Sequence, residues 1–205
     1  MRTMEQPGSE RTISPSCIVS VSGLHGSGKT TVAEALVAEL ASRGYRVGCV
    51  KTIRHRGLAL DAEGTDTRRH AAAGAEFVIA LLDREIAYFE PRSDRPSLRD
   101  ARRLFRPGVQ VVVWEGDLEE EAKPVRVVCL KSAEDLARTL ETRGIPAESV
   151  AAVSGVAAAG FASAGFASAG FASGAGRPPA FDVTDPGQRR ALADVVIGRC
   201  GAGRE

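Results

Sequence analysis

Short apolar runs alternate with helical patterns along most of the chain. The run CIVSVS at 17–22 is rich in β-branched residues and ends at a glycine-rich turn, which predicts a buried strand. From Lys29 to Arg43 the apolar residues share one helical face, and Gly44 follows as a stop signal. This alternation predicts an α/β fold with a mostly parallel central sheet flanked by helices.

The later elements repeat the alternation and end with a helix. Strands are predicted at 45–52, 75–82, 85–90, 109–116, 125–130 and 149–153, with FDV after residue 180 as a candidate edge strand. Helices are predicted near 66–73, at 97–105, at 132–142 behind a Ser132/Asp135 capping box, and from Asp185-Pro186 through Ile197. The strands at 75–82 and 85–90 are close enough in the chain to pair as a hairpin.

Two segments interrupt this pattern. Residues 1–15 are polar and contain two prolines, which predicts a disordered tail before one domain at 16–200. Inside that domain, GFASA repeats belong to an insertion at 155–179, and their five-residue phenylalanine period fits neither a helix nor a strand. The repeats therefore predict a flexible insertion, and the alternative is a phenylalanine-bearing contact for a partner or a second subunit.

Charge and residue content exclude several classes of protein. The 205 residues carry a net charge of +1, which argues against a general nucleic-acid binder, and no apolar segment is long enough to cross a membrane. The four cysteines show no CxxC spacing and three of them lie in apolar runs, so we expect buried, reduced thiols in a cytoplasmic protein rather than zinc ligands or disulfides. Asparagine is absent, which excludes an Asn-Lys-x-Asp motif for reading guanine.

The most specific motif is GLHGSGKT at 23–30, which satisfies GxxxxGK[ST] between a predicted strand and a predicted helix. Its glycines let backbone N–H groups surround phosphate oxygens, and the helix N-terminus adds a favourable dipole. We expect Lys29 to reach the β- and γ-phosphates and Thr30 to place its hydroxyl on Mg²⁺. The predicted nucleotide-binding residues of this loop are Gly23, Gly26, Ser27, Gly28, Lys29, Thr30 and Thr31.

A phosphate loop of this kind needs a carboxylate near the metal. Glu115 ends a predicted strand, at the edge where ligands collect in parallel sheets, and a solvated loop acid is the alternative. Asp61 and Asp66 follow the second strand and compete for the metal or water-positioning role. Lys51 and His55 lie in a basic stretch that is predicted either to bind a second anionic group or to stay solvated. The candidate catalytic residues are Lys29, Glu115 and Asp66, and the candidate metal ligands are Thr30, Glu115 and Asp61.

An arginine-rich face is predicted on the helix at 97–105. Its members are Arg95, Arg99, Arg102, Arg103 and Arg106. In the simplest interpretation this face is solvated. The alternatives are a phosphate clamp, a contact with the acidic residues 115–121 of another subunit, and nucleic-acid binding.

Further motifs make the chain similar to a known family. RGYRVGCVK, a His-containing loop, DAEGTDT leading to AAAGAE, WEG and VAAVSG follow one another in the chain. In this order they resemble the molybdopterin-guanine dinucleotide biosynthesis protein B (MobB) family of P-loop proteins, over roughly 17–155 and 180–198. The resemblance implies a P-loop NTPase fold and a GTP-binding adapter with weak hydrolysis, commonly dimeric. Such an adapter would assist a nucleotidyl transferase in attaching a nucleotide to the molybdopterin cofactor.

The chain departs from the family pattern near the candidate site. Thr52 and Arg54 stand where the family usually has His, Asp117-Leu118 replaces Phe-Lys, and Gly155 takes the place of a late Asp. Two other functions therefore stay open. One is a small-molecule P-loop kinase whose arginine-rich segment 92–106 closes as a lid, and the other is a nucleotide-gated binding module without turnover.

Overall fold

The computed structural model describes residues 15–53, 61–118, 122–132, 134–158 and 178–201 of the 205-residue chain. The chain divides into two compact units, one made of Met1–Thr52 with Asp100–Glu205 and the other of Ile53–Arg99. His55, nearly all of the tail predicted at 1–15 and most of the insertion predicted at 155–179 lie outside the described residues. That residues 16–200 fold as one domain stays a prediction.

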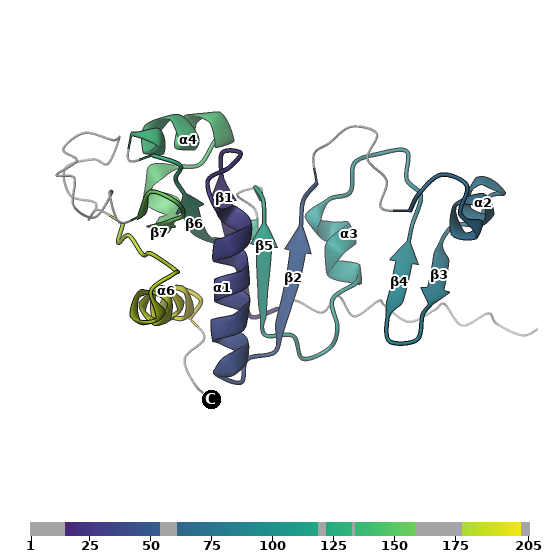
Figure 1. Cartoon of the computed structure of the whole chain (residues 1–205), viewed down its shortest axis with the longest axis horizontal. Helices are drawn as coiled ribbons and strands as arrows, with labels where there is room; N and C mark the ends of the chain where they lie inside the picture. Colours follow the sequence, from purple (N-terminus) through teal and green to yellow (C-terminus); the bar gives the residue numbers. More distant parts are fainter. Residues whose placement is uncertain (1–14, 54–60, 119–121, 133, 159–177, 202–205) are drawn as a thin grey trace, which may run out of the picture. The chain divides into compact units, whose positions relative to one another are not determined.

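The first unit is built on a five-stranded sheet in which every neighbouring pair is parallel. Its strands are β1 (Cys17–Gly23), β2 (Val47–Lys51), β5 (Val111–Glu115), β6 (Val125–Cys129) and β7 (Val150–Ser154). Their order is β2-β5-β1-β6-β7, so β5 lies between the first two strands of the chain (Figure 1). The predicted α/β class with a parallel central sheet is confirmed.

Helices cover both faces of this sheet. They are α1 (Lys29–Ser42), α4 (Asp135–Arg143) and α6 (Pro186–Arg199), with the short 3-10 helix η2 (Ala147–Ser149) before β7. α1 and α6 pack on the face that contains Val127, whereas α4 packs on the face that contains Val128. Each fully buried side chain such as Leu36 contributes about 1.5–3 kcal/mol. None of the helices that the structure describes combines the length and hydrophobicity needed to cross a membrane.

The last two helices begin close to their predicted caps. Asp185 accepts the Gln188 N–H at 2.7 Å, and α6 continues two residues beyond its predicted end at 197. α4 begins at Asp135 rather than at 132, because the Asp135 carboxylate accepts the Ser132 N–H at 3.0 Å in a turn that precedes the helix. The edge strand predicted after residue 180 is wrong, since only an isolated bridge at Ala180 is present there.

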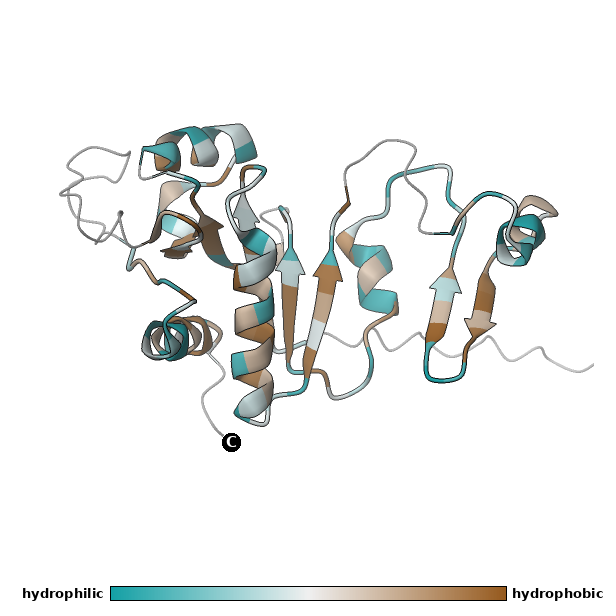
Figure 2. Ribbon diagram, viewed as in Figure 1, coloured by the Kyte–Doolittle hydropathy of each residue, from teal (hydrophilic) through white to brown (hydrophobic). Residues whose placement is uncertain are grey.

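The second unit contains α2 (Asp66–Ala72), β3 (Val78–Leu81) and β4 (Ile86–Phe89). The two strands pair antiparallel, so the predicted hairpin is confirmed. The cross-strand pairs Ile79 with Tyr88 and Leu81 with Ile86 lie on one face of the hairpin, and all four side chains are exposed. We call these four residues the hairpin face. Figure 2 shows that β3 consists largely of hydrophobic residues.

The helix α3 (Leu98–Arg103) is shorter than the one predicted at 97–105. Arg95 and Arg106 lie outside it, so the predicted helical face of five arginines is wrong. Each of these two residues precedes a proline, and a proline disfavours helical backbone in the residue before it. Only Arg99, Arg102 and Arg103 are helical.

The cysteines differ from their prediction. Cys17 at the start of β1 and Cys200 after α6 form a disulfide, with their Cα atoms 5.3 Å apart, so the expectation of reduced thiols is wrong for this pair. Packing of α6 against α1 and β7 brings Cys200 to Cys17, although the two cysteines are 183 residues apart in the chain. Cys49 and Cys129 are free, and of these two only Cys129 is buried, so the expectation of a buried thiol is wrong for Cys49.

The disulfide should stabilise the purified, oxidised protein. Replacing both partners, Cys17→Ser with Cys200→Ser, is expected to lower the free energy of unfolding by about 2–4 kcal/mol, because the bridge restricts the unfolded chain. Urea unfolding measures this loss, and the exposed Cys49→Ser serves as the control. Alkylation of denatured, unreduced protein should label two thiols; labelling of all four cysteines would contradict the bridge.

Candidate functional site

The phosphate loop joins β1 to α1 at the carboxyl edge of the sheet. Gly23, Gly26 and Gly28 have φ angles of 154°, 74° and 84°, in the region that favours glycine. A Cβ on Gly23 would also collide with the Cys129 carbonyl. Gly28 caps α1, and the first N–H groups of a helix have no partner inside it, so they are free to bind an anion.

Ser27 belongs to this loop, and its side chain is fully buried. Its N–H donates to the Leu24 carbonyl at 3.3 Å. Its hydroxyl has no hydrogen-bond partner among the residues that the structure describes. A buried hydroxyl without a partner is costly, and it fits a loop that closes around an anionic ligand.

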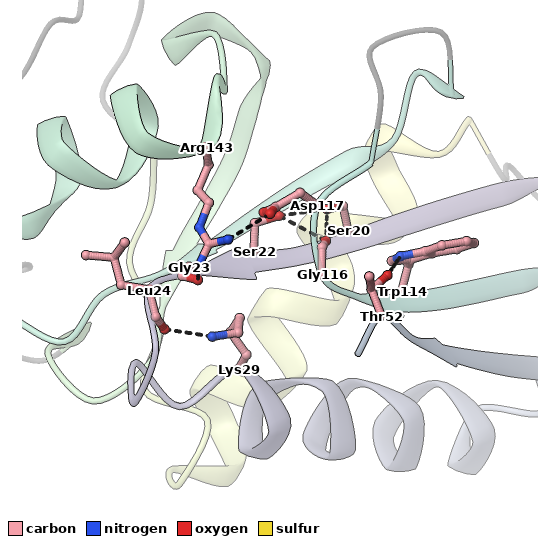
Figure 3. A network of polar contacts seen from close by, with 10 residues as sticks. All are labelled: Ser20, Ser22, Gly23, Leu24, Lys29, Thr52, Trp114, Gly116, Asp117 and Arg143. Atoms are coloured by element: carbon pink, nitrogen blue, oxygen red, sulfur yellow. Dashed lines mark hydrogen bonds and ion pairs between the residues drawn. The ribbon is translucent and has the colours of Figure 1, made fainter. Parts of the chain in front are cut away.

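Lys29 is held by the loop itself. Its Nζ donates to the Leu24 carbonyl at 2.6 Å (Figure 3). The pKa of Lys29 lies below its usual value, first because burial disfavours the charged form and then because the Arg143 cation is nearby. A partly desolvated ammonium beside a second cation gains from contact with a phosphate.

Glu115 meets the loop through Thr30. The Thr30 hydroxyl donates to Glu115 Oε1 at 2.8 Å. Lys51 Nζ lies 3.1 Å from the same carboxylate oxygen and donates to the Thr30 hydroxyl at 3.3 Å. The Glu115 side chain is only 11% exposed, which contradicts the alternative of a solvated loop acid. The structure thus brings together three residues that the sequence singles out separately.

The same two oxygens fit a magnesium ion. Mg²⁺ holds its ligands at about 2.0–2.1 Å in an octahedron, so neighbouring ligands lie about 2.9 Å apart. The separation of Thr30 Oγ1 and Glu115 Oε1 is 2.8 Å, and the Lys51 ammonium supplies positive charge at this point. The described residues include no group of three or more His, Cys, Asp or Glu that could hold a metal. Mg²⁺ is usually bound by one or two protein carboxylates, with phosphates and water completing the shell.

Buried hydrogen bonds fix the strand end that carries Glu115. Ser20 and Ser22 of β1 are fully buried and donate to the Gly116 carbonyl at 2.9 and 3.1 Å (Figure 3). The Thr52 N–H donates to the Glu115 carbonyl at 2.9 Å. The carboxylate therefore extends from a backbone that neighbouring strands hold on both sides.

Arg143, the last residue of α4, reaches the same loop. Its Nη2 donates to the Gly23 carbonyl at 2.9 Å and its Nη1 donates to Asp117 Oδ2 at 2.9 Å (Figure 3). Sequence reasoning misses this residue, because an arginine just before Gly144 is typical of a cation that complements a helix C-terminus. In the sequence Asp117 is one of the acidic residues at 115–121 and a departure from the family pattern, and neither feature indicates a contact with Arg143.

Of the predicted site residues that the structure describes, Asp61 and Asp66 lie in the second unit. Asp61 accepts a hydrogen bond from the Thr65 hydroxyl at 2.7 Å, and Thr65 is the N-cap of α2. Asp66 pairs with Arg69 at 3.2 Å on the same helix. Their metal and water-positioning roles stay predictions.

Thr31 lies exposed in the first turn of α1.

Gly155 supports the loop from the end of β7. Its φ is 95°, and a Cβ there would collide with the Ser27 carbonyl and come within 3.0 Å of the Leu130 backbone. The next residue, Val156, donates its N–H to the Ser27 carbonyl at 3.3 Å. Glycine in the place of the family's late Asp thus allows the backbone after β7 to pack directly on the backbone of the phosphate loop at Ser27.

Proteins of a known family match this chain. A family model described as Molybdopterin guanine dinucleotide synthesis protein B matches residues 18–151. A molybdopterin-guanine dinucleotide biosynthesis adapter protein of Haemophilus influenzae is 33% identical over 105 residues, 50% of this chain and 58% of that protein. A probable adapter protein of the same name from Bacillus subtilis is 40% identical over 65 residues, 31% of this chain and 38% of that protein. The matches therefore span less than two thirds of these relatives.

The fold is also shared with solved structures. The crystal structure of Bacillus subtilis MobB aligns with a TM-score of 0.60 and 23% identity, over 88% of this chain and 98% of that chain. A second structure, of a MobB homologue from Bacillus stearothermophilus, aligns with a TM-score of 0.55 and 21% identity, over 90% of this chain and 98% of that chain. These likenesses are consistent with a P-loop NTPase-like α/β fold.

Alanine at Gly155 should cost more stability than alanine at Gly144. Both glycines have positive φ, 95° and 60°, but no heavy atom lies within 4 Å of a Cβ on Gly144. We expect Gly155→Ala to lower the free energy of unfolding by about 3 kcal/mol and Gly144→Ala by about 1 kcal/mol. Urea unfolding of both variants provides the comparison, and equal losses would contradict the close packing of Gly155 on the loop.

Proposed function

Because the chain belongs to the Molybdopterin guanine dinucleotide synthesis protein B (MobB) family, we propose that it is a Mg²⁺-dependent GTP-binding protein. The family is involved in molybdopterin guanine dinucleotide biosynthesis, and in this proposal the protein assists that biosynthesis. The contact between Thr30 and Glu115, beside a phosphate loop that contains Lys29, is the observation that carries the proposal. These residues would supply the positive charge that the phosphates of a nucleoside triphosphate require and the oxygens that bind its metal ion.

In this proposal the loop binds the triphosphate through its backbone. The N–H groups at the start of α1 face the phosphate oxygens, and Lys29 exchanges the Leu24 carbonyl for the β- and γ-phosphates. Thr30 and Glu115 would hold Mg²⁺, which would supply charge neutralisation at the phosphates. Lys51, which pairs with the Glu115 carboxylate, would then be available to a second anionic group.

We propose weak hydrolysis rather than efficient turnover. Hydrolysis at a P-loop needs a residue that orients the attacking water. Glu115 already accepts from Thr30 and pairs with Lys51. Glu115 is thus engaged at the loop, and the assignment of the water-positioning role to Asp66 stays a prediction from the sequence.

The preference for guanine rests on the family rather than on a base-reading motif. The relatives are named for molybdopterin-guanine dinucleotide biosynthesis, which supports GTP. The chain contains no Asn, so the recognition of guanine must come from other side chains or from backbone groups.

The proposed partners are molybdopterin, its nucleotidyl transferase and a second copy of the chain. The relatives are named adapter proteins, which supports an enzyme partner. The hairpin face supports a homodimer, because Leu81 and Ile86 are 77% and 68% exposed and exposed apolar patches often form contacts. We also propose a cytoplasmic location, where GTP is supplied and where the thiol pool would reduce the Cys17–Cys200 pair.

The two alternative functions differ in their support. The small-molecule kinase is less well supported, because its proposed arginine lid at 92–106 contains only the short helix α3. The nucleotide-gated module would use the same binding site as the proposed weak GTPase, and it differs from that GTPase only in that it does not hydrolyse the nucleotide. Recovery of intact GTP after long incubation would favour the module, whereas slow release of phosphate would favour the weak GTPase.

Removal of the loop lysine should abolish tight nucleotide binding. We expect Lys29→Ala to weaken the binding of labelled Mg²⁺–GTP by about 10- to 100-fold, because a charge-assisted contact with phosphate is lost. Fluorescence titration measures this change, and Lys131→Ala, an exposed lysine outside the loop, is the matched control. Parallel titration with ATP tests the base preference. No detectable nucleotide binding by the wild type would contradict the proposal.

A further inference from the structure

Arg143 holds the first peptide group of the phosphate loop from the α4 side. Its Nη2 donates to the Gly23 carbonyl at 2.9 Å (Figure 3). The side chain is 21% exposed, and its Nε is buried without an acceptor among the described residues. The guanidinium is therefore held through its terminal nitrogens, by the loop and by Asp117.

The contact of Arg143 with the Gly23 carbonyl fixes the orientation of the whole Gly23–Leu24 peptide group. In a trans peptide the C=O and the following N–H point in opposite directions. The carbonyl of Gly23 is turned toward Arg143, so the N–H of Leu24 must point to the opposite side. The carbonyl of Leu24 in turn accepts from Lys29 and from the Ser27 N–H. The orientation of one peptide thus affects the whole loop.

Asp117 keeps the guanidinium in this place. Its carboxylate lies 2.9 Å from Arg143 Nη1 and is 15% exposed, so water screens the pair only in part. The negative charge also offsets the repulsion between Arg143 and the nearby Lys29. Asp117 follows Glu115 by two residues, so the segment that carries the metal-binding carboxylate also sets the position of Arg143.

We propose that Arg143 is a positioning residue of the phosphate loop, which sets the Gly23–Leu24 peptide for phosphate binding while Asp117 holds its guanidinium. The inference rests on the proposed function, because it assumes that the loop binds a nucleotide. It assigns Arg143 no contact with the phosphates. The loop surrounds phosphate groups that GDP and GTP share, so a positioning role predicts the same loss of affinity for both.

The test compares Arg143→Met with Arg138→Met, which removes an exposed arginine from the same helix. The first readout is hydrogen exchange at the Ser27 amide in nucleotide-free protein. We expect about tenfold faster exchange in Arg143→Met, because the Leu24 carbonyl that accepts from this amide is no longer fixed. The second readout is the affinity for Mg²⁺–GTP and Mg²⁺–GDP, which should fall by a similar factor of about ten for both.

Two further variants separate positioning from general loss of structure. Arg143→Lys should restore part of both readouts, and Asp117→Asn should give an intermediate effect on both. If hydrogen exchange at the Ser27 amide is unchanged in Arg143→Met, the inference is overturned. If Arg143→Met does not fold, unchanged exchange at this amide in Asp117→Asn overturns it instead. A loss of affinity confined to GTP would also overturn it, because it would indicate a direct contact with the γ-phosphate. If the wild type binds neither nucleotide, the proposed function fails, whereas Ser27 exchange still decides the role of Arg143.

Discussion

The hydrogen bond from Thr30 to Glu115 is the contact on which the site depends. It joins the first turn of α1 to the end of β5, and it requires β5 to lie beside β1, with Val21 opposite Glu115. On its other side β5 pairs with β2, where Lys51 is opposite Glu115. One carboxylate therefore receives a hydroxyl from the helix and an ammonium from the neighbouring strand. The strand order, more than any single residue, creates the chemistry of this edge of the sheet.

The backbone around Glu115 is held by polar groups that are buried and paired. The Trp114 indole N–H donates to the Thr52 hydroxyl at 2.8 Å, and two serines of β1 share the Gly116 carbonyl. A Cβ on Gly116 would lie 2.9 Å from the Thr52 side chain, so this turn is packed as closely as its glycine permits. A satisfied buried network of this kind favours one arrangement, and a carboxylate fixed in advance needs little reorganisation to meet a metal ion.

Local features of the site could be predicted from the sequence, whereas contacts across the fold could not. The phosphate loop lies within 23–30, and each of its residues has a role that depends on its neighbours in the chain. Glu115 is recognisable as a strand-end acid. The contact of Arg143 with Gly23 joins residues 120 positions apart, and it depends on the packing of α4, which hydrophobic periodicity does not specify. The Cys17–Cys200 pair could not be predicted for the same reason, because only the packing of α6 against α1 and β7 brings these cysteines together.

The central claim is that Thr30 and Glu115 bind a divalent ion together with GTP. Electron paramagnetic resonance of Mn²⁺, which favours the same oxygen ligands as Mg²⁺, measures this binding directly. We expect a bound-Mn²⁺ signal in the wild type that requires GTP, that is lost in Glu115→Gln, and that is retained in Glu34→Gln, where an exposed carboxylate of α1 is removed. A GTP-dependent signal of equal strength in Glu115→Gln, or no such signal in the wild type, would contradict the claim.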